Sequence, residues 1–304
     1  MVEWLDIGTQ YLSQWFKSTP DLNFIQGMTE NTTIIIHSRV AIGYVGSNTT
    51  GFVLQMGGYE VITVPTVLYS NHLGYTTVGG GKIPEELFSD ILKGILKLEI
   101  LKNVSTIITG FIGSAEQVRI IADFIRTIKK YKPEILYLCD PVMGDIDKGQ
   151  YVEPDVPDAI IEHLIPLADL LTPNQFEAER IINKQIGTAE NIALLLQERF
   201  DLSKKKIVIT GGGFDVSRKD LIYNCIVENK NCNIIKTRKI DLHPPGTGEL
   251  FTAHLYLSIL RGMKLRDAVA LSGDILSAVL LKMYSNNRTN FELRDILFSM
   301  NILK

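Results

Sequence analysis

The chain has 304 residues, of which 45% are hydrophobic and 21% charged, and its net charge of −3 at pH 7 is typical of a globular protein. Its few basic runs exclude the concentrated basic face on which nucleic-acid binding depends. Three cysteines without CxxC spacing, and the lack of a run of about 18 apolar residues, predict a cytoplasmic protein without disulfides, a zinc site or a membrane span.

The amino-terminal segment 1–33 has the pattern of an appended amphipathic helix. Apolar residues recur at helical spacing from Trp4 to Phe16, and Ser18-Thr19-Pro20 ends the pattern. Lys17 is the segment's only lysine, so docking on the protein itself or on a dimer partner is favoured over binding to an anionic membrane surface. We expect the remainder, 34–304, to form a single domain.

From residue 33 onward, short β-rich apolar runs alternate with longer segments of helical period. This alternation predicts βαβ units and an α/β fold in which a mainly parallel sheet is covered by helices on both faces. Strands are expected at 33–38, 60–66, 104–109, 135–140, 170–172 and 206–210, and helices at 84–97, 114–131, 175–182 and 188–200.

The pattern changes after Thr210. An antiparallel pair is expected at 221–228 and 233–242, and helices at 248–261, 265–283 and 291–300 close the chain. Ligands of open parallel sheets bind at the carboxyl ends of the strands. The residues expected at those ends are Ser38, Thr66, Gly110, Asp140, Asn174 and Gly211.

The strongest local motif is Pro245-Gly246-Thr247-Gly248-Glu249, a glycine turn that leads into an apolar helix. Glycines allow backbone N–H groups to point inward, and the amino terminus of a helix adds partial positive charge, so the turn can bind a phosphate. The Glu249 carboxylate could accept the proton of an attacking hydroxyl during phosphoryl transfer. The alternative is an ordinary turn in which Glu249 complements the helix dipole.

A second motif places two carboxylates, Asp140 and Asp145, five residues apart after a strand. Carboxylate oxygens at such a point suit a magnesium ion that keeps most of its waters and bridges nucleotide phosphates. The alternative is that Asp140 caps a loop and Asp145 lies on the surface.

A third motif, Leu171-Thr172-Pro173-Asn174-Gln175-Phe176-Glu177, is again a strand end that turns into a helix. Asn174 and Glu177 have the spacing of a capping box, which explains them without a function. Their coincidence with the other two motifs favours a role in the same phosphate site.

Other known phosphate-binding motifs are not matched. Gly79-Gly80-Gly81-Lys82 lacks the spacing and the following hydroxyl of a Walker loop. Thr210-Gly211-Gly212-Gly213 follows a strand but does not open a helix, so we interpret it as a loop near a nucleotide.

These motifs, in this order, resemble the ribokinase superfamily, and longer stretches resemble its pyridoxal kinase family. The resemblance covers roughly residues 33–285. The stretches that carry it are 38–46, 64–75, 109–113, 139–145, Tyr151-Val152 and 171–179.

The resemblance implies a ribokinase-like α/β/α sandwich that uses ATP and Mg²⁺, often with K⁺ or Na⁺, to phosphorylate the 5-hydroxymethyl group of pyridoxal. Pyridoxine and pyridoxamine are further expected substrates in vitamin B6 salvage, and a homodimer is expected. For substrate binding it implies Ser38, Val45, Thr66, His72 and Phe111. For ATP it implies Asp140, Asp145, Tyr151, Thr172, Asn174, Thr210, Gly211 and Thr247. For metal it implies Asp140, Asp145 and Glu177, for the anion hole Gly246, Thr247 and Gly248, and for the catalytic base Glu249.

The chain departs from the family pattern at two of these positions. Glu249 stands where the family has aspartate, and a catalytic group misplaced by about 1 Å can cost on the order of 100-fold in rate. Phe111 stands where the family commonly has tyrosine, which keeps the apolar face and loses a hydroxyl. A catalytically impaired paralogue that binds vitamin B6 is therefore one alternative. Hydroxymethylpyrimidine kinase is another, although Ser70-Asn71-His72 and Tyr151 favour pyridoxal.

Overall fold

The computed structural model describes residues 31–303 except 188–190, 193, 194, 197, 202–204, 213–217, 219, 229 and 230. The helix expected within 1–33 lies outside the described residues, so the division into an extension and a 34–304 domain stays a prediction. Of the helix expected at 188–200, the described part includes helical residues at 191, 192, 195 and 196.

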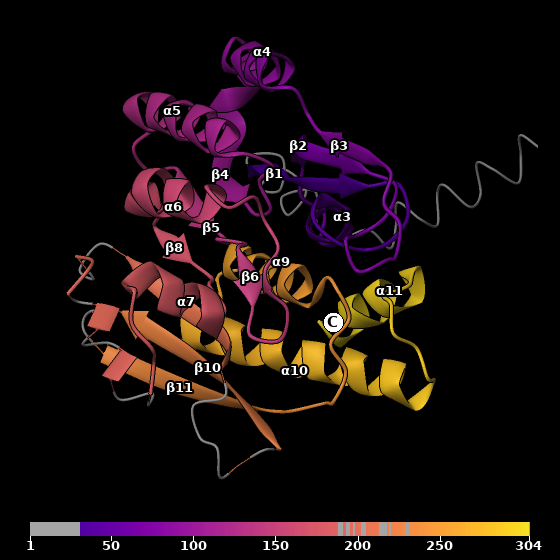
Figure 1. Ribbon diagram of the computed structural model, residues 1–304. Helices are drawn as coiled ribbons and strands as arrows, with labels where there is room; N and C mark the ends of the chain where they lie inside the picture. Colours follow the sequence, from indigo (N-terminus) through magenta and orange to yellow (C-terminus); the bar gives the residue numbers. More distant parts are fainter. Residues whose placement is uncertain are drawn as a thin grey trace, which may run out of the picture.

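One nine-stranded sheet forms the centre of the described chain (Figure 1). Its strands, in spatial order, are β11 (Asn231–Arg238), β10 (Leu221–Glu228), β9 (Lys206–Gly212), β8 (Leu170–Leu171), β5 (Leu136–Cys139), β4 (Val104–Thr109), β1 (Thr32–Val40), β2 (Val61–Tyr69) and β3 (Gly80–Lys82). From β9 to β2 neighbouring strands are parallel, whereas β3, β10 and β11 pair antiparallel at the two edges. A separate small sheet pairs β6 (Gly144–Asp145) with β7 (Gly149–Gln150).

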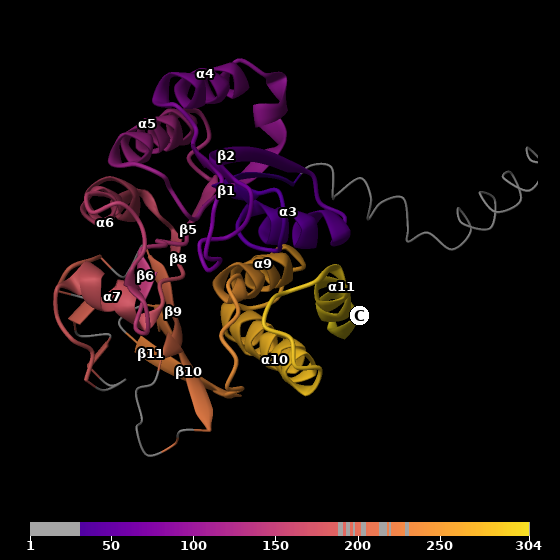
Figure 2. The same cartoon turned by 45° about the vertical axis from the view of Figure 1, so that its right-hand side comes forward.

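Helices cover both faces of the sheet (Figures 1 and 2). On one face lie α3 (Ser47–Met56), α9 (Thr247–Leu260), α10 (Leu265–Ser285) and α11 (Leu293–Ile302). On the other lie α4 (Glu85–Leu96), α5 (Ala115–Tyr131), α6 (Val156–Ala159) and α7 (Gln175–Ile182). Short helical turns span Glu99–Asn103, Ile160–Leu164 and Ile165–Leu167. The predicted three-layer α/β/α arrangement is confirmed.

Strand β1 shows why the sequence forms a doubly covered sheet. Side chains alternate across a strand, and here both sets are apolar. Ile34 and Ile36 are buried in the core beneath α4–α7, whereas Ile35 is buried in the core beneath α3 and α9–α11. Because helices cover both faces of the sheet, every residue in this part of β1 must be apolar, as in other parallel sheets with two covered faces.

Several element boundaries differ from the sequence-based expectation. Strands β1, β2 and β9 run on past 38, 66 and 210 to Val40, Tyr69 and Gly212, because pairing with neighbouring strands continues there. The expected strand at 233–242 is shifted to Asn231–Arg238 by pairing with β10. Strand β3 was not expected, because two of its three residues are glycines.

Helix α10 is long and apolar enough to meet the length and composition of a membrane span, with 44% of the relevant window buried inside the protein. It packs against α9, α11 and β11. These contacts are those of a core helix in a globular protein.

Candidate active site

The predicted site residues gather where the parallel strands end, and the sheet is irregular at that point. The register between β1 and β2 shifts by one residue between His37 and Arg39, so Thr66 and Val67 lie opposite Ser38. A bulge of this kind redirects side chains and is frequent beside active sites. Ser38 and Thr66, two of the residues expected to bind the substrate, lie opposite one another at this bulge on neighbouring strands.

Phe111 forms a hydrogen bond with Thr66 directly and is linked to Ser38 through His37. The Thr66 hydroxyl donates to the Phe111 carbonyl at 2.7 Å, and the Phe111 N–H donates to His37 Nδ1 at 3.3 Å. Ser38 Oγ lies 3.2 Å from the same His37 nitrogen. Val45 is buried in the turn before α3. The structure thus assembles Ser38, Thr66 and Phe111 into one group.

The glycine turn opens helix α9, which begins at Thr247, one residue before the expected start. Gly246 is the N-cap residue and has φ +102°, a region that favours glycine. A Cβ at Gly246 would lie 2.4 Å from the Tyr44 carbonyl oxygen, so the turn also packs tightly against the loop before α3. Gly248 lies in the first helical turn, is exposed, and has open space around it. The turn therefore offers unpaired N–H groups at a helix amino terminus, as a phosphate site requires.

Glu249 projects from the same helical turn toward a second helix. The Gly46 N–H donates to Glu249 Oε1 at 3.0 Å, and Gly46 is the N-cap residue of α3. No hydrogen bond joins Glu249 Oε2 to any residue that the structure describes. The carboxylate is thus held by one oxygen between two helix amino termini, whose dipoles favour its negative charge, while the other oxygen can accept a proton.

Asp140 follows β5 and is 8% exposed. Its Oδ2 accepts a hydrogen bond from the Thr252 hydroxyl at 3.3 Å, and Thr252 in turn lies 3.5 Å from the Thr172 hydroxyl. Burial raises the pKa of Asp140 well above its usual range, and the nearby charges of Glu177 and Glu249 raise it further. Three of the expected site residues are therefore close enough to interact electrostatically.

Asn174 and Glu177 form the capping box that the sequence suggested as the alternative to a functional role. The Asn174 side chain accepts from the Glu177 N–H and donates to the Gly144 carbonyl at 2.8 Å. Glu177 accepts from the backbone N–H groups of Met143 at 2.9 Å and Asn174 at 2.8 Å. Burial raises the pKa of Glu177 to about 8, against the lowering effect of these backbone hydrogen bonds. Both residues therefore shape the loop after Asp140.

Asp145 is the last residue of β6, and Tyr151 directly follows β7. Asp145 Oδ1 accepts from the Lys148 N–H at 2.6 Å, and the Tyr151 N–H donates to the Met143 carbonyl at 3.1 Å. Burial raises the pKa of Tyr151, and the charge of Glu177 raises it further. The Tyr151 ring thus borders the same carboxylates.

Magnesium is the metal that the carboxylates suit. Asp140, Glu177 and Glu249 repel one another electrostatically, and no Lys or Arg among the described residues forms an ion pair with them. A bound cation would relieve that repulsion. No group of three or more His, Cys, Asp or Glu in the described chain could hold a metal alone. The donor set fits Mg²⁺ bound by one or two carboxylates together with water and phosphate oxygens.

His72 lies in the loop between β2 and β3, apart from Ser38 and Thr66. Its Nε2 is 2.9 Å from Asn290 Oδ1, and its Nδ1 accepts from the Gly74 N–H at 3.1 Å. A Cβ at Gly74 would lie 3.5 Å from the Pro245 ring, so this loop borders the turn Pro245–Glu249, which is expected to bind phosphate. Both ring nitrogens of His72 already have partners within the protein.

Thr210 belongs to strand β9, as the expected strand at 206–210 predicts, but Gly211 also lies in this strand and not in a loop, which corrects the sequence-based interpretation. The Thr210 N–H donates to the Pro173 carbonyl at 2.9 Å, and Thr210 bridges to Asn174. Gly211 has φ +66°, and its N–H donates to Asn224 Oδ1 at 3.2 Å. These contacts place both residues beside the capping box of α7.

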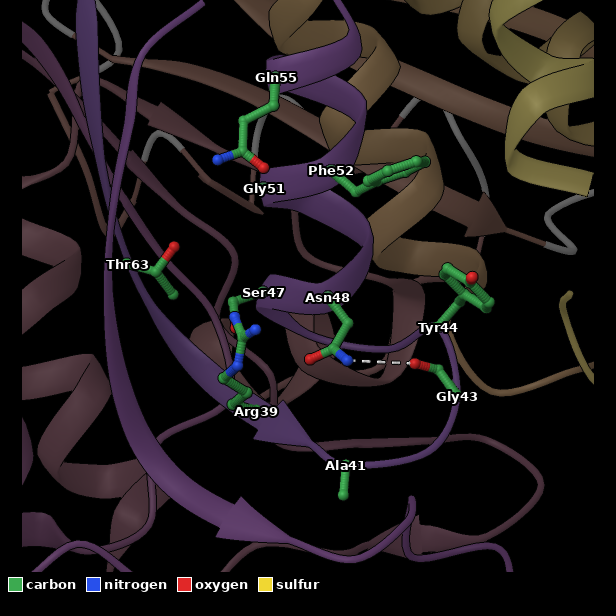
Figure 3. Close-up of a pocket in the computed structure, with 10 residues that line it drawn as sticks. All are labelled: Arg39, Ala41, Gly43, Tyr44, Ser47, Asn48, Gly51, Phe52, Gln55 and Thr63. Atoms are coloured by element: carbon green, nitrogen blue, oxygen red, sulfur yellow. Dashed lines mark hydrogen bonds between the residues drawn. The ribbon is translucent and has the colours of Figure 1, made fainter. Parts of the chain in front are cut away.

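A pocket of about 380 Å³ lies between α3 and strands β1 and β2 (Figure 3). None of the predicted site residues lines it. Asn48, which does, donates to the carbonyls of Val40 at 2.8 Å and Gly43 at 3.3 Å. Asn48 in the pocket wall therefore holds the loop that carries Gly46 in place.

Two site residues were not identified from the sequence. Thr252 lies three residues after Glu249 on one helix, and this spacing could have indicated a shared face. Gly46 contacts Glu249 across 203 residues of sequence, and no local pattern signals that contact.

Comparisons with known proteins agree on the family. The sequence model of a family described as phosphomethylpyrimidine kinase matches residues 51–293. The chain is 33% identical over 254 residues to the pyridoxal kinase PdxY of Deinococcus radiodurans, covering 81% of this chain and 84% of the relative. It is 31% identical over 243 residues to the pyridoxine/pyridoxal/pyridoxamine kinase of Bordetella avium, covering 80% and 82%.

Solved structures agree as well. The crystal structure of pyridoxal kinase from Entamoeba histolytica matches with a TM-score of 0.78 at 25% identity, over 90% of this chain and 96% of that one. The fold and the matching family model define a small-molecule kinase of the ribokinase superfamily. Within that superfamily, the chain belongs to the pyridoxal kinase family.

Proposed function

We propose that this protein transfers the γ-phosphate of ATP to the 5-hydroxymethyl group of pyridoxal, and of pyridoxine and pyridoxamine, in vitamin B6 salvage. The observation that carries the proposal is the position of Glu249. Its carboxylate lies at the phosphate turn, with one oxygen anchored and one free. Relatives that are at least 30% identical bear the names pyridoxine/pyridoxal/pyridoxamine kinase and pyridoxal kinase PdxY.

The proposed reaction needs little chemistry from the protein beyond positioning and charge stabilisation. Ser38, Thr66 and Phe111 hold the pyridine ring so that the 5-hydroxyl faces the γ-phosphate. Glu249 Oε2 accepts the hydroxyl proton while the new O–P bond forms and the bond between the γ-phosphorus and the β-phosphate oxygen breaks. N–H groups of the Gly246–Gly248 turn stabilise the phosphoryl oxygens.

Asp140 and Asp145 are the residues that we expect to hold Mg²⁺, with Glu177 as the third proposed contact. A bound magnesium ion neutralises charge on the nucleotide phosphates. The Thr252 hydroxyl orients Asp140, and the capping box keeps the loop after Asp140 in place. Tyr151, Thr172, Thr210 and Gly211 are the proposed neighbours of the nucleotide, and K⁺ or Na⁺ is the proposed activating ion.

Glu249 supports an active enzyme over an impaired vitamin-binding paralogue. Its longer side chain still places the carboxylate at the first turn of α9 and gives it a hydrogen bond from Gly46. A fixed position satisfies the geometric requirement for a general base. The change in rate caused by glutamate in place of the family aspartate then depends on the distance from the Glu249 carboxylate to the substrate hydroxyl.

The second candidate substrate is hydroxymethylpyrimidine, and the family model named after phosphomethylpyrimidine kinase favours considering it. The distinguishing experiment measures kcat/KM for pyridoxal and hydroxymethylpyrimidine with the purified protein, ATP and Mg²⁺. We expect the ratio to favour pyridoxal. A ratio that favours the pyrimidine would overturn the substrate assignment and leave the kinase class intact.

We also propose that the protein is a cytoplasmic homodimer that binds neither nucleic acid nor a membrane. Light scattering of the purified chain tests the oligomeric state. Fractionation of cells that express the full chain tests the location.

A further inference from the structure

His37 lies between the groups expected to hold the substrate ring. It is 2% exposed at the bulge of β1. Its Nδ1 accepts hydrogen bonds from the backbone N–H of Ser38 at 2.8 Å and from that of Phe111 at 3.3 Å, and Ser38 Oγ lies 3.2 Å away. One imidazole nitrogen therefore contacts both segments that carry predicted ring contacts.

These contacts fix the tautomer of His37. A nitrogen that accepts from two backbone N–H groups carries no proton, so the proton of the neutral ring lies on Nε2. Burial lowers the pKa of His37, which favours the neutral ring, while the Glu249 charge opposes the shift. An unprotonated Nδ1 can only accept, so the Ser38 hydroxyl must donate its proton to make a hydrogen bond there.

Two glycines hold the imidazole ring in this position. A Cβ at Gly110 would lie 2.0 Å from Nε2 and 2.1 Å from Cδ2, so the ring packs directly against the backbone that follows β4. A Cβ at Gly46 would lie 3.1 Å from Nδ1 and 2.2 Å from Ser38 Oγ. Gly46 is also the donor to Glu249, so the ring is packed between β1, β4 and the turn that anchors the proposed base.

We propose that His37 is a specificity-determining positioning residue: its Nδ1 accepts a hydrogen bond from the Ser38 hydroxyl, so that Ser38 offers the substrate ring only a hydrogen-bond acceptor. The protein then selects rings that present a donor at this point, either a protonated ring nitrogen or a phenolic hydroxyl. This inference deepens the proposed function and rests on its assignment of Ser38 to the substrate ring.

The experiment measures binding, so that it does not depend on turnover. Dissociation constants are determined by calorimetry, with a non-hydrolysable ATP analogue present, for pyridoxal, pyridoxal N-oxide and the 3-methyl ether of pyridoxal. Each analogue removes one of the two ring donors. The full-length natural chain is compared with His37→Leu, which has no acceptor, and with His37→Gln, whose amide oxygen can accept.

We expect the natural chain to discriminate against one analogue by about tenfold, the value of one hydrogen bond to a charged or polar partner. His37→Leu should lose this discrimination, because its Ser38 hydroxyl is free to donate. His37→Gln should retain it, and ATP affinity should stay within about twofold in both. A merely structural residue would weaken all three ligands alike. Unchanged discrimination in His37→Leu would overturn the inference.

A second measurement covers the case in which His37→Leu does not fold. ¹⁵N NMR of the natural chain, with the His37 signal assigned by its loss in His37→Gln, should show an unprotonated Nδ1. A proton on Nδ1 would overturn the inference, as would a natural chain that does not bind pyridoxal. Binding of pyridoxal without phosphate transfer would overturn the proposed function alone.

Discussion

The two glycines of the phosphate turn are expected to respond in opposite ways to the same substitution. Gly246 has φ +102°, and an alanine Cβ there would lie 2.4 Å from the Tyr44 carbonyl oxygen. The left-handed conformation costs about 1–2 kcal/mol for an alanine, and relieving such a clash costs about 1–3 kcal/mol more. We therefore expect Gly246→Ala to lower the free energy of unfolding by about 2–5 kcal/mol.

Gly248→Ala is the matched control, two residues away in the same turn. Gly248 lies inside α9 with nothing near its Cβ position, so alanine should stabilise the helix by about 0.5–1 kcal/mol. Gly248 is exposed in the turn proposed to bind phosphate, so we nevertheless expect its new methyl group to obstruct the phosphate. Loss of one anion-hole interaction costs on the order of 100-fold in kcat, and we expect a decrease of about that size.

Chemical denaturation and thermal unfolding of both variants measure stability, and steady-state kinetics with ATP and pyridoxal measure activity. The expected result is an unstable Gly246→Ala and a stable but slow Gly248→Ala. A Gly246→Ala protein as stable as the natural chain would refute the reasoning from backbone conformation. A fully active Gly248→Ala would refute the placement of phosphate at this turn.

Three further predictions concern single side chains. Glu249→Gln should reduce kcat by about 100-fold or more, because general-base catalysis is lost. The melting temperature should not change. A kcat equal to that of the natural chain would remove Glu249 from the mechanism. Asn290→Ala should raise KM for pyridoxal but not for ATP, because the His72 side chain beside the phosphate turn loses its 2.9 Å contact with Asn290 Oδ1. Unchanged kinetics would show that this contact has no role in substrate binding. Burial lowers the pKa of His254 from 6.5 to about 4, so the folded state should lose up to about 3 kcal/mol as pH falls from 6.5 to 4. Chemical denaturation at pH 6.5 and pH 4 measures this loss of stability. The loss should be smaller in His254→Gln and unchanged in His243→Gln, which alters an exposed histidine and serves as the control. Equal losses in the two variants would contradict the prediction.

The layers of the fold could be predicted from the sequence because the parallel strands are apolar on both faces. Ile34, Ile35 and Ile36 alternate between two cores, and few other folds bury both faces of such an apolar strand. Strand β3 could not be predicted, because Gly80 and Gly81 have low strand propensity and only pairing with β2 makes them a strand. The ends of β1 and β2 were placed too early, because pairing between these strands continues to Val40 and Tyr69 past the register shift.

The candidate site was predictable as a set of strand-end motifs but not as a set of contacts. Asn174 and Glu177 could be paired from their spacing alone, and the capping box confirms that pairing. Glu249 was identified from its position in the glycine turn, whereas its anchor at Gly46 depends on the packing of α9 against α3. The role of His37 depends on a hydrogen bond from Phe111, 74 residues away, and on the space left by Gly110.

The central claim is tested most directly by incubating the purified protein with ATP, Mg²⁺ and pyridoxal and identifying the products by mass spectrometry and ³¹P NMR. We predict equal amounts of ADP and pyridoxal 5′-phosphate, with the phosphate on the 5-hydroxymethyl oxygen. ADP release that does not depend on pyridoxal, or no phosphorylated product from a protein that binds both ligands, would contradict the account.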